Sequence, residues 1–480
     1  MNKKLVFAAV MGLTCGVAFA LNATPQYKGK PNILMIYTDD LGWGDLSCHG
    51  HPYAKTPNID NLAKEGIDFQ QFEVVNPVCS PSRAALMTGQ YPARYSVHGH
   101  FDTVKWNRKR GMTDWLDPQA VMLPRLLKQA GYATAHYGKW HLSNADALNI
   151  CPKATEYGYD DYAGWNGPKP SCEPRAIYDR ALDFIRTHRD KPFFINLWMH
   201  ETHTPHHPSK ESMAQYAHLN KREQVYAAVL ADADKGVGKV LDGLNQMGLA
   251  DNTLVVFSSD NGPSPGGMAG EPKGYREMEN YYGNYYSVGR TGDLRGCKAT
   301  IFEGGVRTPL IVRWPGKAPA GKINDKTVVA VTDLLPTFCA AAGVELPAGY
   351  KPDGENMLNA FKGEEITRSK PIFWDWRMGR SDLLWYGKNK ADWVPGAEES
   401  TRQLNWATAA VRDGDWKLVM NNEQSRIELY DFSKDCRDEI TNVAKKHPEV
   451  VQRLIAMWKA WANTLPTAPD PNCQVSKIEP

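Results

Sequence analysis

The sequence lacks several features that would define a protein class at once. Its nine cysteines include no pair separated by two residues, which excludes zinc knuckles and thioredoxin-like redox sites. Beyond residue 20, no apolar run approaches the roughly 20 residues that cross a bilayer, so no membrane span is expected there. No internal repeat is evident. The composition, with 42% hydrophobic and 23% charged residues, is that of an ordinary globular protein.

Charge of one sign is also missing. The chain has 56 Lys and Arg against 54 Asp and Glu, and loss of residues 1–20 would leave 54 of each. Proteins that bind nucleic acid or membrane surfaces by general electrostatic attraction need a basic excess. We therefore expect no nucleic-acid or membrane partner, and any anionic ligand must be held by a local cluster of cations.

Residues 1–20 are predicted to form a signal peptide. Lys3 and Lys4 give a basic start, an apolar stretch follows, and Ala18-Phe19-Ala20 fits a cleavage site. Thr14 disfavours a lipoprotein signal at Cys15, because Gly or Ala usually stands there. The sequence thus predicts a periplasmic or secreted protein, in which some cysteines should pair. Cys151 and Cys172 bracket a loop rich in glycine and proline, and we predict this pair, although sequence alone does not determine pairing.

Several apolar runs end in polar residues, which is typical of parallel strands that deliver side chains at their carboxyl ends. These runs are 32–40, 132–141, 192–203 and 252–262, and 308–316 adds one more strand. Helical spacing of apolar residues lies between them, at 56–66, 176–188 and 222–248. This alternation predicts an α/β fold with a large, mostly parallel sheet sandwiched by helices.

The pattern changes after residue 363. Segments 371–377, 406–421 and 427–432 resemble strands of a small antiparallel sheet, and 448–465 is typical of an amphipathic closing helix. We predict a catalytic domain over 31–363 and a smaller α+β subdomain over 364–480, or else a continuous extension of one domain.

Two acidic pairs follow predicted strands. Asp39-Asp40 ends one and Asp260-Asn261 ends another, which would bring three carboxylates and an amide oxygen together. A single Asp at a strand end more often belongs to a turn or a helix cap. Two such pairs favour a site for Ca²⁺ or Mg²⁺, since both ions prefer oxygen ligands.

A cysteine stands at the start of a predicted helix in 76–89, "NPVCSPSRAALMTG". Pro81 suits the first turn and Gly89 the end, which places Cys79 at the helix N-terminus, where a thiolate is stabilised. A lone cysteine is more often a small buried hydrophobe. A thiolate is also a poor ligand for the hard cation that the carboxylates predict.

The motif Cys79-Ser80-Pro81-Ser82-Arg83, continued by "AALMTGQYPAR", resembles the signature of the formylglycine-dependent sulfatases. The resemblance extends from residue 31 to 444 and implies an alkaline-phosphatase-like fold. In that family a maturation enzyme oxidises the cysteine to an aldehyde, C-formylglycine (3-oxoalanine). The hydrate of this aldehyde offers oxygen to the metal, so the resemblance implies that Cys79 is a precursor.

The resemblance also implies the roles of individual residues. One Ca²⁺ would be bound by Asp39, Asp40, Asp260, Asn261 and the modified Cys79. The catalytic set would comprise Cys79, Arg83, Lys139, His141, His203 and Lys298. Arg83 would hold the hydrate, and Lys298 would contact the sulfate and the leaving oxygen. His203 and His206 both precede x-Pro, and the distance from the start of the strand favours His203.

By the same resemblance, one hydroxyl of the hydrate attacks sulfur, and His203 with Lys298 protonates the departing alcohol. His141 then deprotonates the second hydroxyl, which expels sulfate and regenerates the aldehyde. The expected substrate is a sulfated saccharide, because 263–296 contains five tyrosines that could stack on sugars and 105–110, "KWNRKR", is basic. Alternatives are a small aryl sulfate, a phosphate or phosphonate ester, and a non-catalytic carbohydrate-binding role.

Overall fold

The computed structural model describes residues 30–143, 150–165, 173, 175–264, 282–377, 404–435 and 439–476. The predicted signal peptide and Cys172 lie outside these ranges. The strands are β1 Asn32–Thr38, β2 Ile67–Glu73, β3 Ala133–Lys139, β4 Asp161–Trp165, β5 Phe193–Trp198, β6 Thr253–Ser259, β7 Leu310–Arg313, β8 Lys322–Ala330, β9 Ile372–Asp375, β10 Ala409–Asp413, β11 Trp416–Met420 and β12 Ile427–Asp431. The helices are α1 Pro57–Lys64, α2 Cys79–Thr88, α3 Val104–Lys109, α4 Leu123–Gln129, α5 Ala176–Thr187, α6 Lys210–Gln215, α7 Lys221–Gln246, α8 Glu303–Val306, α9 Leu334–Ala341, α10 Leu358–Phe361 and α12 Pro448–Ala462.

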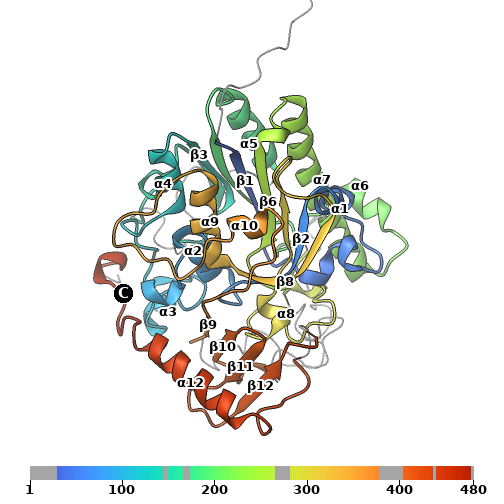
Figure 1. Cartoon of the computed structure of the whole chain (residues 1–480). Helices are drawn as coiled ribbons and strands as arrows, with labels where there is room; N and C mark the ends of the chain where they lie inside the picture. The colour runs from blue at the N-terminus through green and yellow to red at the C-terminus, as the bar shows by residue number, and fades with distance from the viewer. Residues whose placement is uncertain are drawn as a thin grey trace, which may run out of the picture.

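A large sheet forms the centre of the molecule (Figure 1), with eight strands in the order β4-β3-β5-β1-β6-β7-β2-β8. All its pairings are parallel except those of β7, which runs antiparallel to β6 and β2. The prediction of a mostly parallel sheet is therefore confirmed. The predicted strand at 308–316 is β7, so it does not share the direction of the other strands.

Helices cover both faces of this sheet. Side chains of β1 alternate between two core clusters: Ile33, Met35 and Tyr37 join the cluster that contains α2, α4 and α9. Leu34 and Ile36 join the other, which contains α1, α5 and α7. A strand buried on both faces needs apolar residues at every position, and for this reason the apolar run at 32–40 predicts β1 correctly.

The smaller sheet has the order β12-β11-β10-β9, with every neighbouring pair antiparallel. Gly414 takes a left-handed conformation, with φ of 59°, in the tight turn that joins β10 to β11. Helix α12 packs along this sheet (Figure 1), as the sequence predicts. Among the described residues, no helix combines the length and hydrophobicity needed to cross a membrane.

Cys151 is buried and its thiol is free in the described part of the chain, where it lies in a small apolar cluster with Trp115 and Cys473. Its predicted partner, Cys172, lies outside the described residues, so that pairing stays a prediction.

A buried network of charged side chains joins the two sheets. Lys417 of β11 lies 2.6 Å from Glu303 of α8 and 2.8 Å from Glu439, with none of these side chains exposed. Arg412 of β10 lies 2.7 Å from Glu73 at the end of β2. Because a buried charge is costly without its partner, the network makes the position of the small sheet dependent on the large one.

Replacing Lys417 with Met should cost about 3–5 kcal/mol of unfolding free energy, since Glu439 would stay buried without its cation and Glu303 would keep only Arg307 as an ion-pair partner among the described residues. Urea unfolding measures this loss. The matched control is Lys326→Met, because Lys326 is exposed and paired only with its exposed neighbour Asp325; it should cost about 1 kcal/mol or less. Equal losses in the two variants would contradict the structural role of the network.

Candidate active site

The two acidic pairs meet at one edge of the large sheet. Strands β1 and β6 are parallel neighbours whose register pairs Thr38 with Ser259, so the residues that follow each strand emerge side by side. The backbone N–H of Asp40 donates to Asp260 Oδ1 at 3.2 Å, and Asn261 Nδ2 donates to Asp40 Oδ1 at 2.8 Å. Carboxylate oxygens of Asp39, Asp40 and Asp260 lie within 4.8 Å of one another.

Asp40 has a left-handed backbone conformation, with φ of 61°. Consecutive residues of a strand point to opposite faces, and this turn breaks the alternation so that Asp39 and Asp40 join the same cluster. Asp tolerates the left-handed region better than most residues do. Strain of this kind concentrates at functional sites.

Two oxygens of this cluster are suited to a metal ion. Asp39 Oδ1 and Asn261 Oδ1 are buried, and within the described part of the chain neither has a hydrogen-bond partner. Buried polar atoms are nearly always satisfied, so such oxygens need a ligand. Three carboxylates and one amide carbonyl form the kind of oxygen set that Ca²⁺ binds. The donor set therefore fits the predicted metal.

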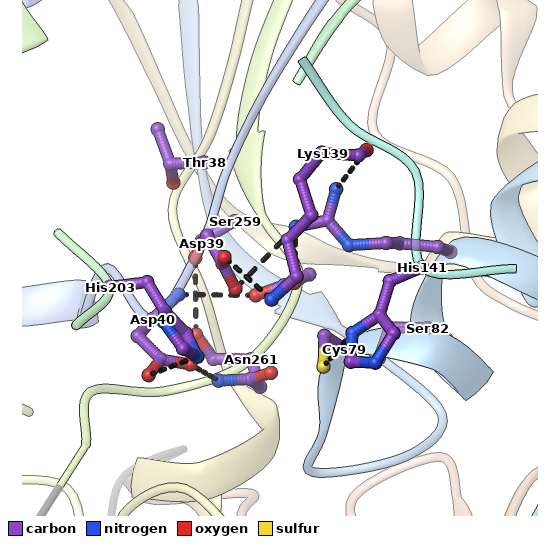
Figure 2. Close-up of polar contacts among 12 residues, drawn as sticks. Thr38, Asp39, Asp40, Cys79, Ser82, Lys139, His141, His203, Ser259 and Asn261 are labelled. Carbon is purple, nitrogen blue, oxygen red and sulfur yellow. Dashed lines mark hydrogen bonds and ion pairs between the residues drawn. The ribbon is translucent and has the colours of Figure 1, made fainter. Parts of the chain in front are cut away.

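Three buried cations balance the three carboxylates. Lys139, at the end of β3, lies 2.7 Å from Asp39 Oδ2 (Figure 2). Lys298 Nζ lies 2.6 Å from Asp40 Oδ1. Lys139 ends β3, whereas Lys298 comes from the segment between β6 and α8, so two separate parts of the chain bring cations to the acidic cluster.

Arg83 is the third of these cations and comes from α2. Its Nη2 donates to Asp260 Oδ2 at 2.6 Å, and the guanidinium lies 4.9 Å from the ring centroid of Trp198. Burial alone would lower the pKa of Arg83, but Asp260 and Asp39 raise it above its ordinary value. The guanidinium is therefore a permanent charge one helical turn from Cys79.

Cys79 is the first residue of α2, as predicted, and is buried. Its Sγ lies 3.1 Å from His141 Nδ1, and Figure 2 shows the two side chains facing each other. The other ring nitrogen of His141 lies 2.9 Å from the carbonyl oxygen of Phe101, which can only accept. Nε2 therefore carries the hydrogen, and the lone pair of Nδ1 faces residue 79. Burial lowers the pKa of His141 to about 3, which keeps the ring neutral.

The structure separates the two candidate histidines. His203 Nε2 lies 3.8 Å from Asp40 Oδ2, and about a quarter of its side chain is exposed. His206 is fully buried; its Nε2 lies 2.9 Å from Ser287 Oγ and its ring packs on Tyr226. The geometry thus favours His203 as the histidine that meets a ligand, and His206 as a structural residue.

Two further histidines border the site, and the sequence analysis did not predict either of them. His200 Nδ1 lies 2.6 Å from Asp39 Oδ2, and its ring stacks on His203 with centroids 4.7 Å apart. His100 lies with its ring 6.3 Å from that of His141 and its Nε2 3.7 Å from Asp102. His200 stands in the same histidine-rich segment as His203, so its proximity was a usable signal. His100 belongs to no motif that would have identified it.

Comparison with known proteins shows the family of this chain. The sulfatase family model matches residues 31–344. N-acetylgalactosamine-6-sulfatase of Sus scrofa is 33% identical over 390 residues, covering 72% of this chain and 68% of that protein. N-acetylgalactosamine-6-O-sulfatase of Bacteroides thetaiotaomicron is 27% identical, covering 89% of this chain and 92% of that protein.

Solved structures are similar over most of the chain as well. The crystal structure of Ps i-CgsB in complex with k-i-k-neocarrahexaose has a TM-score of 0.71 and 26% identity, covering 92% of this chain and 96% of that one. Together the matches identify the protein as an enzyme, a hydrolase of sulfuric esters. The chain belongs to the sulfatase family, so the resemblance drawn from its motifs is confirmed.

Replacing His203 and His206 separately should give opposite results. His203→Ala should leave the unfolding temperature near that of the native chain and lower the rate on an aryl sulfate by about 10² or more, because a proton donor is lost. His206→Ala should lose about 2–4 kcal/mol of stability, since it opens a cavity and leaves Ser287 unpaired. Below its unfolding temperature it should retain most activity. The reverse pattern in rates and melting curves would show that His206 is the catalytic histidine.

Proposed function

We propose that the enzyme hydrolyses sulfate esters of saccharides, with Cys79 converted to formylglycine and one Ca²⁺ bound beside it. The observation that supports this most directly is the place of Cys79. It stands at a helix N-terminus, with a neutral histidine 3.1 Å from its sulfur and an arginine one turn along the same helix. The nearby oxygen ligands suit a hard cation, and a thiolate would be a poor ligand for such an ion.

His141 is suited to act as a base toward residue 79. The carbonyl of Phe101 fixes its tautomer, so Nδ1 is a proton acceptor that faces the side chain at position 79. A hydrated aldehyde carries two hydroxyl groups, whereas a thiol carries one S–H. We expect Nδ1 to take a proton from a hydroxyl at residue 79 after the sulfate group has been transferred.

Asp39, Asp40, Asp260 and Asn261 would hold the metal, and the ion would supply positive charge that stabilises the sulfate oxygens. Lys139 can bind Asp39 and a sulfate oxygen at the same time, because its ammonium carries three donors and Asp39 needs only some of them. Arg83 is held rigid by Asp260 and Trp198, so it needs little reorganisation when the substrate arrives.

The leaving alcohol needs a proton, and we expect protonated His203 to supply it from Nε2, because Nδ1 lies 2.5 Å from the carbonyl oxygen of Thr204. Its side chain is about a quarter exposed, whereas those of Lys139 and Arg83 are fully buried. A partly exposed group can contact the ester oxygen that joins sulfur to the alcohol, while the buried cations bind the other sulfate oxygens.

The names of the relatives support a saccharide as the substrate class. Two are named as sulfatases of N-acetylgalactosamine 6-sulfate groups, and a solved structure contains a neocarrahexaose. Formation of the aldehyde would require a formylglycine-generating maturation enzyme that acts on the motif at 79–83. Export through residues 1–20 to the periplasm or beyond would bring the enzyme to sulfated polysaccharides outside the cell.

The proposal is tested by mass spectrometry of the peptide over residues 76–83 from active enzyme, which should carry the aldehyde in place of the thiol. Cys79→Ala should fold normally and have no measurable turnover. Cys79→Ser, made in a host that converts only cysteine, should be nearly inactive too, because a serine has no second hydroxyl for expulsion of sulfate. A fully active enzyme with an unmodified thiol would refute the mechanism.

Calcium binding can be measured without an activity assay. By calorimetry, Asp40→Asn should bind Ca²⁺ at least about tenfold more weakly than the native chain, since affinity follows the charge of the ligand set. Ca²⁺ should raise its unfolding temperature correspondingly less. Asp293→Asn makes the same chemical change at an exposed position and is the control. Equal affinities in the two variants would remove Asp40 from the metal site.

A further inference from the structure

Helix α3 exposes an aromatic ring between basic side chains. Segment 101–111 has four cationic residues and one acid, Asp102, in a chain of nearly balanced charge. Lys105, Trp106 and Lys109 are exposed, and Trp106 is 38% exposed, which is unusual for so large an apolar side chain. We call these three residues the α3 face.

The ring of Trp106 is held in place by cations. Lys109 Nζ lies 4.3 Å from the ring centroid and the guanidinium of Arg110 lies 5.6 Å from it. Such contacts limit the rotation of the indole, so little conformational entropy remains to be lost when a ligand binds.

Buried contacts also fix the position of helix α3. Asn107 is fully buried and donates to Asp114 Oδ1 at 3.1 Å. Arg108 donates to the backbone carbonyl of Val475, near the end of the chain. The α3 face is therefore presented on a rigid support and is not part of a loose loop.

A series of neighbouring side chains connects the α3 face to residue 79. Arg110 lies 3.5 Å from Asp102, which lies 3.7 Å from His100. The His100 ring is 6.3 Å from that of His141, whose Nδ1 is 3.1 Å from Cys79 Sγ. The backbone N–H of Phe101 donates to Ser80 Oγ at 3.0 Å, which ties the same segment to the start of α2.

We propose that the α3 face is a subsite for a second, anionic sugar of a sulfated oligosaccharide whose scissile sulfate ester lies at residue 79. The indole would stack on the apolar face of the sugar ring, and Lys105 and Lys109 would pair with its sulfate or carboxylate group. An aromatic ring flanked by cations matches a polyanionic saccharide, because each sugar offers both an apolar C–H surface and negative charge. The inference rests on the proposed saccharide substrate and extends it from one sugar to a chain.

The test compares three substrates: an aryl sulfate, a sulfated monosaccharide, and a tetrasaccharide that carries the same terminal sulfate and a further anionic group on the next sugar. The double variant Trp106→Ala/Lys109→Gln should raise KM for the tetrasaccharide about tenfold, the size of effect expected for an aromatic side chain that a ligand covers on binding. Its kcat/KM on the two small substrates should stay within about twofold of the native value, since neither reaches α3. Added salt should raise KM for the tetrasaccharide less in the variant than in the native enzyme.

Two control variants test whether the effect is specific to the α3 face. Lys64→Gln makes the same charge change at an exposed lysine of α1 and should leave all three substrates unaffected. Trp106→Phe keeps a stacking ring and should recover part of the lost affinity. If the double variant cleaves the tetrasaccharide as well as the native enzyme does, the α3 subsite is wrong. If the native enzyme cleaves the aryl sulfate and neither saccharide, the proposed saccharide substrate is wrong as well.

Discussion

The structure depends on one electrostatic constraint, which is that three carboxylates are kept close together and away from water at the edge of a sheet. Asp39, Asp40 and Asp260 lie within 4.8 Å of one another, and all three are buried. Such a cluster is unstable unless it is neutralised. Arg83, Lys139 and Lys298 supply equal positive charge in the folded chain. The same cations are what an anionic substrate would need, so the balance that permits folding also prepares a site for sulfate.

The large and small sheets contribute differently to this site. The parallel strands deliver the acidic pairs and Lys139, while α2 delivers residue 79 and Arg83. The small sheet acts through buried ion pairs. Lys417 holds Glu303, which begins α8 five residues after Lys298, so the segment that brings this lysine to Asp40 is supported by the buried network between the sheets.

The parts of the molecule whose pattern is local can be predicted from the sequence. Fully buried strands such as β1 and β6 read as continuous apolar runs, and α2 begins at Cys79 and ends before Gly89, whose φ is 64°. Strands β2, β4 and β8 were not predicted. Strands β8 and β4 lie at the two edges of the sheet, and β8 mixes buried and exposed residues, so neither has a continuous apolar run. The direction of β7 was also missed, because strand direction depends on pairing and not on composition.

What the sequence by itself determined is the family, since the motif at 79–83 and the two acidic pairs are local patterns that can be read without the fold. Only the tertiary structure decided which side chains share the site. It brought His203 to Asp40 and buried His206, although the two residues stand three apart and precede prolines alike. It placed His200 beside Asp39 and His100 near His141, and it left Cys151 as a free thiol. The physical reason is that proximity across a folded chain follows from sheet order and loop geometry, which arise from packing over the whole molecule.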